Sequence, residues 1–129
     1  MRWFSVLLWM AVIFVLSTEH FSAARTPIAP DTVRFLLRKV AHWTEYFILA
    51  FLFMRALNVS SDKLISKRHI VLSVIVATVY AVTDEWHQSF VPNREAKISD
   101  VAIDAVGACC GTWVWSRVRT AWWMNWIIR

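Results

Sequence analysis

"VTDEWHQSFVPNREAKISDVAID", residues 82–104, is a dense run of polar and ionisable groups. Long apolar segments precede it and follow it directly. Exposing ionisable groups to hydrocarbon costs free energy, so a chain that places them between apolar segments must hold them against one another or against water. The fold and the function of this chain therefore depend on how the flanking segments are arranged around this stretch.

The composition predicts an integral membrane protein. Of the 129 residues, 58% are hydrophobic and 15% aromatic, with only two glycines and a mean hydropathy of +0.48. A soluble domain of this size has a more polar composition. The net charge of +5 comes from basic residues between apolar segments, as the positive-inside rule produces, so we predict no nucleic-acid partner. Cys109 and Cys110 are adjacent and predict neither a disulfide framework nor a metal motif.

Four apolar segments predict an all-α fold, a transmembrane four-helix bundle that forms a single domain over residues 1–129. The predicted spans are about 3–18, 37–57, 68–88 and 100–117, and a short C-terminal interfacial segment rich in Trp and Arg follows them. The apolar part of the third segment, residues 70–83, covers only about 21 Å as a helix, which is too short to cross the hydrocarbon layer. We therefore expect the helix to continue into the polar residues that follow it.

The distribution of Lys and Arg predicts that both termini are cytoplasmic. One side of the membrane holds the termini and the loop around Ser60, and it has more Lys and Arg residues than the other side. On this side lie Arg2, Arg55, Lys63, Lys67, Arg68, Arg117, Arg119 and Arg129. On the other side lie Arg25, Arg34, Arg38, Lys39, Arg94 and Lys97. The first segment and the Ser22-Ala23-Ala24 run also fit a cleaved signal peptide loosely. Cleavage would leave the orientation of the other spans unchanged.

The polar residues are concentrated at segment ends that share one face of the membrane in an antiparallel bundle. They close the first and third segments and open the second and fourth: Ser17, Thr18, Glu19; Arg38, Lys39, His42, Glu45; Asp84, Glu85, His87, Gln88; Asp100 and Asp104. Asp100 and Asp104 share a helix face with Gly107 and Gly111. The two glycines have no side chain, so another helix can approach this face closely. We therefore predict that this acidic face points inward and helps to form a polar pocket on the extracytoplasmic side.

Three motifs resemble the VanZ-like family of small bacterial membrane proteins. They are "FVLSTEH" (14–20), "LRKVAHWTEYFILAFL" (37–52) and "VTDEWHQSFVPNREAKISDVAIDAVG" (82–107). The family pattern falls on Lys39, His42, Glu45, Tyr46, Asp84, Glu85, His87, Gln88, Phe90, Pro92, Arg94, Asp100, Asp104 and Gly107. The resemblance implies a multi-pass protein of the bacterial cytoplasmic membrane with a role in the cell envelope. The family's namesake is associated with resistance to the glycopeptide teicoplanin, which makes antibiotic tolerance an expected role.

One hypothesis for the function is an enzyme that acts on a lipid-linked or cell-wall substrate. Histidine and carboxylate side chains are the usual general acids and bases, and cationic side chains bind phosphate or carboxylate groups. The candidate catalytic residues are His42, Glu45, Asp84, Glu85, His87 and Asp104. The candidate substrate-binding residues are Lys39, Gln88, Arg94 and Asp100. No sequence motif marks a nucleophilic serine or cysteine beside them, which argues against covalent acyl transfer.

Three alternatives stay open at this level. The H-x-x-E and D-E-x-H patterns offer ligands for a divalent metal. A second alternative is a non-catalytic protein that binds or sequesters a lipid or an amphipathic drug such as a glycopeptide. Transport would require more than one chain, and a homodimer packed through Gly107 and Gly111 could form a transport pathway. The third is that the charges are retained for helix registry alone. The number of polar groups on one side favours a functional pocket.

Overall fold

The computed structural model describes residues 2–18, 30–57, 67–91 and 96–127, with side chains up to residue 119. These residues form four α-helices and no strand, as the sequence predicts. The helices are α1 (Arg2–Leu16), α2 (Asp31–Leu57), α3 (Lys67–Gln88) and α4 (Ile98–Ile127). The polar residues at the end of the third apolar segment are helical, because α3 continues to Gln88.

Local chemistry accounts for where α2 begins. The carbonyl of Pro30 accepts hydrogen bonds from the backbone N–H groups of Val33 and Arg34. Asp31 lies in the first turn, where a carboxylate interacts favourably with the positive end of the helix dipole. The helix therefore starts six residues before the predicted span at residue 37, and its first turns carry polar groups outside the apolar segment.

The fourth helix is longer than predicted. It runs without interruption for 30 residues, about 45 Å at the rise of an α-helix. The helix therefore continues through the predicted C-terminal interfacial segment, beyond the predicted end of the fourth span near residue 117. The physical reason is simple: residues 118–127 contain neither proline nor glycine, so nothing in them breaks the helix.

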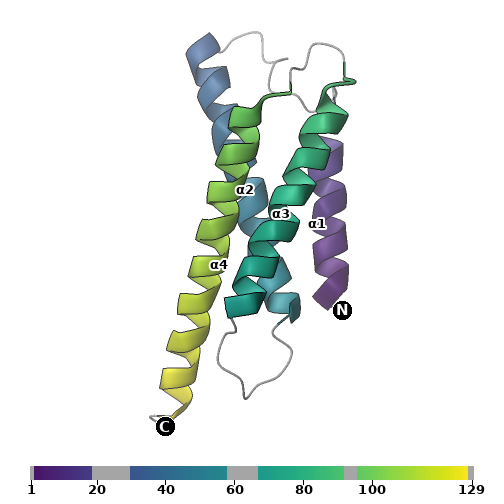
Figure 1. The fold of residues 1–129 in the computed structure, drawn as a ribbon. Helices are drawn as coiled ribbons and strands as arrows, with labels where there is room; N and C mark the ends of the chain where they lie inside the picture. Colours follow the sequence, from purple (N-terminus) through teal and green to yellow (C-terminus); the bar gives the residue numbers. More distant parts are fainter. Residues whose placement is uncertain (1, 19–29, 58–66, 92–95, 128–129) are drawn as a thin grey trace.

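The helices alternate in direction (Figure 1). The start of α1 and the end of α4 lie at the same end of the bundle, drawn at the bottom in Figure 1. The opposite end holds the end of α1, the start of α2, the end of α3 and the start of α4. Helix α2 contacts α1, α3 and α4, so it is the central helix.

Small residues let the helices approach closely. Alanines make up much of the buried core, including Ala50, Ala77, Ala81 and Ala108. A Cβ atom added to Gly107 would overlap the backbone carbonyl oxygen of Trp43, and one added to Gly111 would overlap that of Phe47. The glycine stripe of α4 therefore packs on α2 of the same chain.

Two side-chain hydrogen bonds attach α1 to the other helices. The indole N–H of Trp9 donates to the backbone carbonyl of Glu45 on α2, at 2.9 Å. The hydroxyl of Tyr80 on α3 donates to the backbone carbonyl of Met10, at 2.7 Å. Both acceptors are main-chain carbonyls, so these bonds hold α1 in position without occupying any side-chain acceptor of the bundle.

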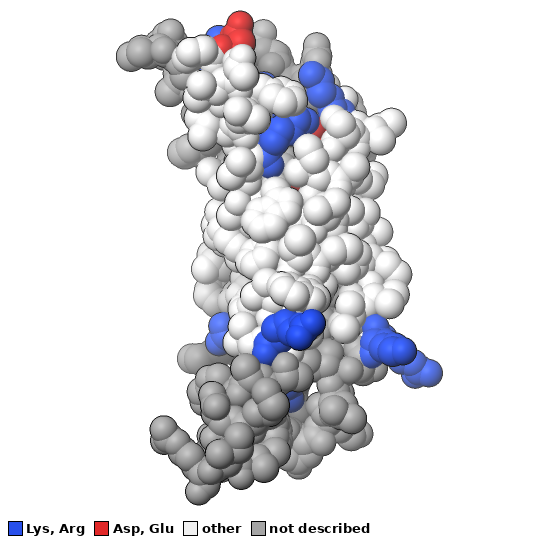
Figure 2. All heavy atoms as spheres, turned by 90° about the vertical axis from the view of Figure 1, so that its left-hand side faces the viewer, with Lys and Arg blue, Asp and Glu red and all other residues white. Residues whose placement is uncertain are grey.

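Two of the helices, α2 and α3, are long and apolar enough to cross a membrane, and α1 is a shorter apolar helix. Large apolar side chains are exposed on the outward faces of the helices, among them Phe4, Leu7, Val40, Val79, Val106 and Trp113. On the face drawn in Figure 2, a broad belt of uncharged residues separates Lys and Arg side chains gathered at two levels. The surface thus has the pattern of a protein whose middle section contacts lipid.

Candidate functional site

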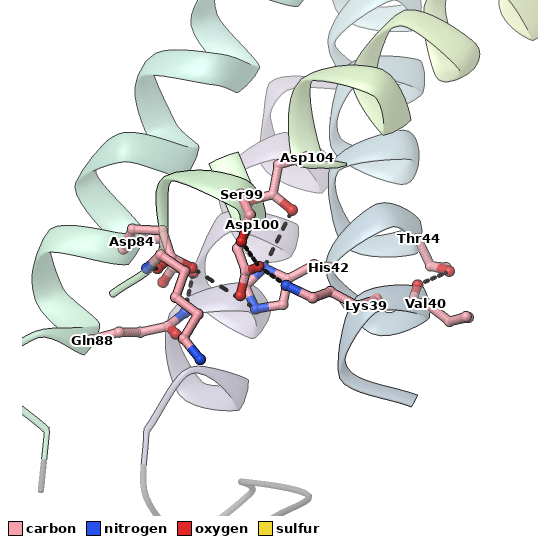
Figure 3. A network of polar contacts seen from close by, with 11 residues as sticks. Lys39, Val40, His42, Thr44, Asp84, Gln88, Ser99, Asp100 and Asp104 are labelled. Atoms are coloured by element: carbon pink, nitrogen blue, oxygen red, sulfur yellow. Dashed lines mark hydrogen bonds and ion pairs between the residues drawn. The ribbon is translucent and has the colours of Figure 1, made fainter. Parts of the chain in front are cut away.

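Charged and amide side chains of three helices meet at the end of the bundle opposite to the termini (Figure 3). We call this group the polar cluster. It consists of Lys39 and His42 from α2, Asp84, Glu85 and Gln88 from α3, and Asp100 and Asp104 from α4. Except for the half-buried Lys39, these residues are buried. The structure thus brings together seven of the ten residues that the sequence predicts for the site.

His42 lies between carboxylates of two other helices. Its Nδ1 atom is 3.2 Å from Oδ1 of Asp104 on α4. Its Nε2 atom is 3.9 Å from Oε1 of Glu85 on α3. The side chains of all three are at most 6% exposed, so these contacts are shielded from solvent. An imidazole held in this way has one nitrogen oriented by a carboxylate and the other directed toward a second carboxylate.

Lys39 forms an ion pair with Asp100 between α2 and α4. Its ammonium group contacts Oδ1 of Asp100, and the hydroxyl of Ser99 also donates to that oxygen, at 3.2 Å. The ammonium group lies 5.1 Å from the ring centroid of Phe35, within cation–π range. Lys39 therefore neutralises the first of the two aspartates on α4.

The carboxylates of α3 are held by neighbouring donors. Oε2 of Glu85 accepts a hydrogen bond from the backbone N–H of Lys97, just before α4, at 2.8 Å. The side-chain amide of Gln88 donates to Oδ2 of Asp84, one turn away, at 2.8 Å. The bond to Lys97 connects the end of α3 to the residue just before α4, and the bond from Gln88 lies within α3. Each bond orients one of the two carboxyl groups.

Sequence spacing explains why the cluster forms. Lys39 and His42 are three residues apart, and Asp100 and Asp104 are four apart, so each pair lies on one face of its helix. The stripe of Asp100 and Asp104 continues into Gly107, whose missing side chain lets α4 pack directly on the backbone of α2. This close approach brings the acidic face of α4 against His42, as the sequence predicts.

Three predicted site residues take other positions. Glu45 is half-buried one turn after His42, and its backbone carbonyl accepts the hydrogen bond from Trp9. The ring of His87 packs on Phe14 of α1, with the ring centroids 4.4 Å apart. Arg94 lies outside the described residues. The chemical roles predicted for all ten residues stay predictions.

Tyr46 lies in this region, although it is not among the candidate catalytic or substrate-binding residues predicted from the sequence. Its side chain is fully buried on α2, one turn after His42, and its hydroxyl has no hydrogen-bond partner among the described residues. A buried hydroxyl without a partner costs free energy. Its membership of the family motif was the signal that could have identified it, since aromatic residues are otherwise common in apolar helices.

The cluster concentrates negative charge in a buried site. Asp84, Glu85, Asp100 and Asp104 are each at most 5% exposed. Oε1 of Glu85 and both carboxylate oxygens of Asp104 are buried without a hydrogen-bond donor among the described residues. Such a site requires protons or cations to offset the cost of burial. One donor atom each from His42, Glu85 and Asp100 lies within 4.8 Å of the others, which is a spacing suited to a metal ion.

The comparisons with known proteins identify the family. The model of the VanZ/LLP1 family matches residues 2–120, a range that includes the whole polar cluster and the glycine stripe. No curated protein and no solved structure matches the chain. The match covers all of the three motifs that predict this relationship in the sequence. The chain therefore belongs to the VanZ/LLP1 family.

Proposed function

We propose that this chain is an integral protein of the bacterial cytoplasmic membrane, with four spans, cytoplasmic termini and the polar cluster at the extracytoplasmic end. The length and hydropathy of α2 and α3 support this assignment, as do the exposed apolar side chains and the uncharged belt in Figure 2. Helices α1 and α4 pack beside α2, so they share its environment. The excess of Lys and Arg on the side that holds the termini and the loop around Ser60 supports the orientation.

We further propose that the polar cluster is an envelope site that acts on a lipid-linked or cell-wall precursor. The observation that supports it best is the position of His42 between the carboxylates of Glu85 and Asp104, which belong to two other helices. An imidazole and carboxylates in this arrangement can hold or move a proton at a substrate oxygen. Lys39 supplies a cation for a phosphate or carboxylate of the substrate. Tolerance of envelope antibiotics, including glycopeptides such as teicoplanin, is the expected consequence for the cell.

The first test measures antibiotic susceptibility in cells that produce the protein at matched membrane abundance. His42→Ala, Asp84→Asn and Asp104→Asn are expected to abolish the tolerance that the unchanged protein confers. Asp31→Asn is the matched control, because the Asp31 side chain is 94% exposed and forms an ion pair only with its helix neighbour Arg34 among the contacts described. Cluster variants that are present at normal abundance and protect like the unchanged protein would contradict the proposal.

A second test separates catalysis from binding. Purified protein is incubated with a bacterial lipid extract, and the lipids are analysed by mass spectrometry. A product that forms with the unchanged protein and is absent with His42→Ala supports an enzyme. A lipid that co-purifies without being converted supports the alternative, a membrane protein that binds or sequesters an amphipathic molecule. If the assay finds neither a product nor a bound lipid, the result contradicts a lipid-linked substrate.

A further inference from the structure

We infer that the polar cluster is a divalent-cation site, with His42, Glu85 and Asp100 as ligands and Asp104 as the group that orients His42. The inference deepens the proposed function, because it rests on the same cluster, but ion binding does not require the substrate. With the ion bound, His42 acts as a ligand, and proton transfer at the substrate falls to the carboxylates of the cluster. Each of the three ligands comes from a different helix, and their donor atoms lie within 4.8 Å of one another. All three residues are at most 5% exposed.

The distance between His42 and Glu85 suits a shared ion. Two ligand atoms that each lie about 2.1 Å from one ion can be separated by at most about 4.2 Å. Nε2 of His42 and Oε1 of Glu85 are 3.9 Å apart, which is too long for a hydrogen bond and within that limit. The ligand atoms of the three residues all lie within 4.8 Å of one another, so no pair exceeds the limit by more than roughly half an ångström. A small side-chain rotation on ion binding would remove such a difference.

The second nitrogen of His42 lies beside a carboxylate, the kind of group that usually orients metal-binding histidines. Histidine ligands commonly donate their other ring N–H to a carboxylate, which fixes the tautomer and the orientation of the ring. Nδ1 of His42 lies 3.2 Å from Oδ1 of Asp104, and the Asp104 side chain is 1% exposed. The contact is an ion-pair distance without the angles of a hydrogen bond, and a small rotation of the ring would complete that bond. With the proton on Nδ1, the lone pair of Nε2 is available on the side of Glu85.

A buried carboxylate oxygen of the cluster has no hydrogen-bond donor in the described part of the chain and suits a cation as its partner. Oε1 of Glu85 is buried and has no hydrogen-bond partner among the described residues, although Oε2 of the same carboxylate is held by the backbone N–H of Lys97. Buried carboxylate oxygens are rarely left in this state, because the lost hydration is costly. Oε1 is also the oxygen that faces Nε2 of His42, where the ion would lie.

The third ligand keeps its ion pair. Lys39 and Ser99 contact Oδ1 of Asp100, and neither of these bonds uses Oδ2, so we assign Oδ2 to the ion. Among the described residues, Lys39 compensates only one of the buried carboxylates, so a divalent cation would offset negative charge that remains in the cluster. A set of one imidazole nitrogen with carboxylate oxygens fits Zn²⁺ or Mn²⁺ better than Ca²⁺, which prefers oxygen ligands alone. When bound, such an ion polarises a phosphate or carbonyl oxygen of a substrate.

The test measures metal content in the full chain, purified in detergent without a polyhistidine tag. The protein is treated with a chelator, dialysed against Zn²⁺ or Mn²⁺ and analysed by mass spectrometry for metals. About one ion per chain is expected. Glu85→Gln and Asp100→Asn are expected to lose stoichiometric binding, and Asp104→Asn is expected to weaken it about 10- to 100-fold, the usual effect of losing a group that orients a ligand.

Matched controls are Asp31→Asn and His69→Gln, which change a carboxylate and an imidazole outside the cluster and should bind like the unchanged protein. Circular dichroism and gel filtration check that each variant is folded. If the variants do not fold, the visible absorption of Co²⁺ bound to the unchanged protein reports directly on imidazole and carboxylate ligation. Folded unchanged protein that binds neither Zn²⁺ nor Mn²⁺, or Glu85→Gln that binds like Asp31→Asn, would overturn the inference.

The outcomes separate this inference from the proposed function. Absence of metal, together with loss of antibiotic tolerance in the cluster variants, would remove the cation site and leave the envelope function. Stoichiometric metal, together with normal tolerance in the cluster variants, would leave the cation site and remove the envelope function.

Discussion

At the scale of single residues, the ion pair between Lys39 and Asp100 shows how strongly burial changes the value of a charge. The Asp100 side chain is 3% exposed and that of Lys39 is 15% exposed. The ion pair of Asp31 and Arg34 on the same helix has side-chain exposures of 94% and 30%. Removing one partner from a buried pair leaves an uncompensated charge, whereas an exposed carboxylate is hydrated by water.

We therefore predict that Lys39→Met lowers the free energy of unfolding by about 3 kcal/mol. The double variant Lys39→Met/Asp100→Asn should be less destabilised than Lys39→Met alone, because it does not bury an unpaired carboxylate. The measurement is reversible unfolding in detergent. Arg34→Met is the control, with an expected change of at most about 1 kcal/mol. A Lys39→Met protein as stable as the Arg34→Met protein would contradict this account.

Two tyrosines on neighbouring helices provide a second prediction. The hydroxyl of Tyr80 donates to the carbonyl of Met10, whereas the buried hydroxyl of Tyr46 has no partner among the described residues. Tyr80→Phe should lower the free energy of unfolding by about 1 kcal/mol. Tyr46→Phe should leave stability unchanged or raise it, because it removes a buried polar group that forms no hydrogen bond. Equal losses in the two variants, measured by thermal unfolding, would argue that Tyr46 has a partner.

At the scale of elements, α4 combines two functions on one face. Asp100 and Asp104 contribute carboxylates near its start, and Gly107 and Gly111 allow close packing on α2 further along. The packing positions the carboxylates, because both features lie on the same helical stripe. A change in the glycines should therefore affect the cluster as well as stability.

We predict that Gly111→Leu destabilises the bundle by about 1–3 kcal/mol, or prevents folding, because the side chain would overlap the backbone of Phe47. The gain in helix propensity from replacing glycine, about 1 kcal/mol, does not offset a clash with main chain. Ala102→Leu is the matched control, since Ala102 is exposed on the same helix. Gly111→Leu that unfolds at the same temperature as Ala102→Leu would show that the two helices can separate without cost.

At the scale of the whole molecule, the alternation of four helices places both ends of the chain opposite to the polar cluster (Figure 1). In a membrane this arrangement has a direct consequence for labelling. The native Cys109 and Cys110 are first replaced by alanine, and single cysteines are introduced by Ser89→Cys beside the cluster and Arg2→Cys near the N-terminus. We predict that a membrane-impermeant maleimide added to spheroplasts labels the first variant and not the second.

Lysed membranes provide the control for this experiment, because both positions are exposed and both should react once the reagent reaches each side. If only Arg2→Cys is labelled in spheroplasts, the orientation in the membrane is opposite to the one proposed. Labelling of both in spheroplasts would contradict a bundle whose two ends lie on opposite sides of the membrane.

Much of the fold could be predicted from the sequence because apolar segments of helical length are a local property. The four helices, the continuation of α3 through Asp84 and Glu85, and the family relationship all follow from composition, segment length and motifs. The end of α4 could not be predicted in the same way. Trp and Arg residues after residue 117 indicate a preference for an interface, but they do not break a helix, so the helix continues.

The sequence by itself determined which residues share a helix face and which ends of the helices meet, because helical spacing and alternation of direction depend only on order along the chain. Only the tertiary structure decided which side chains contact one another: that His42 lies between Glu85 and Asp104, that Lys39 pairs with Asp100, and that His87 packs on Phe14. The physical reason is that these contacts depend on the rotation and separation of whole helices. Those are set by packing such as that of Gly107 on the backbone of Trp43, which spacing within one helix does not encode.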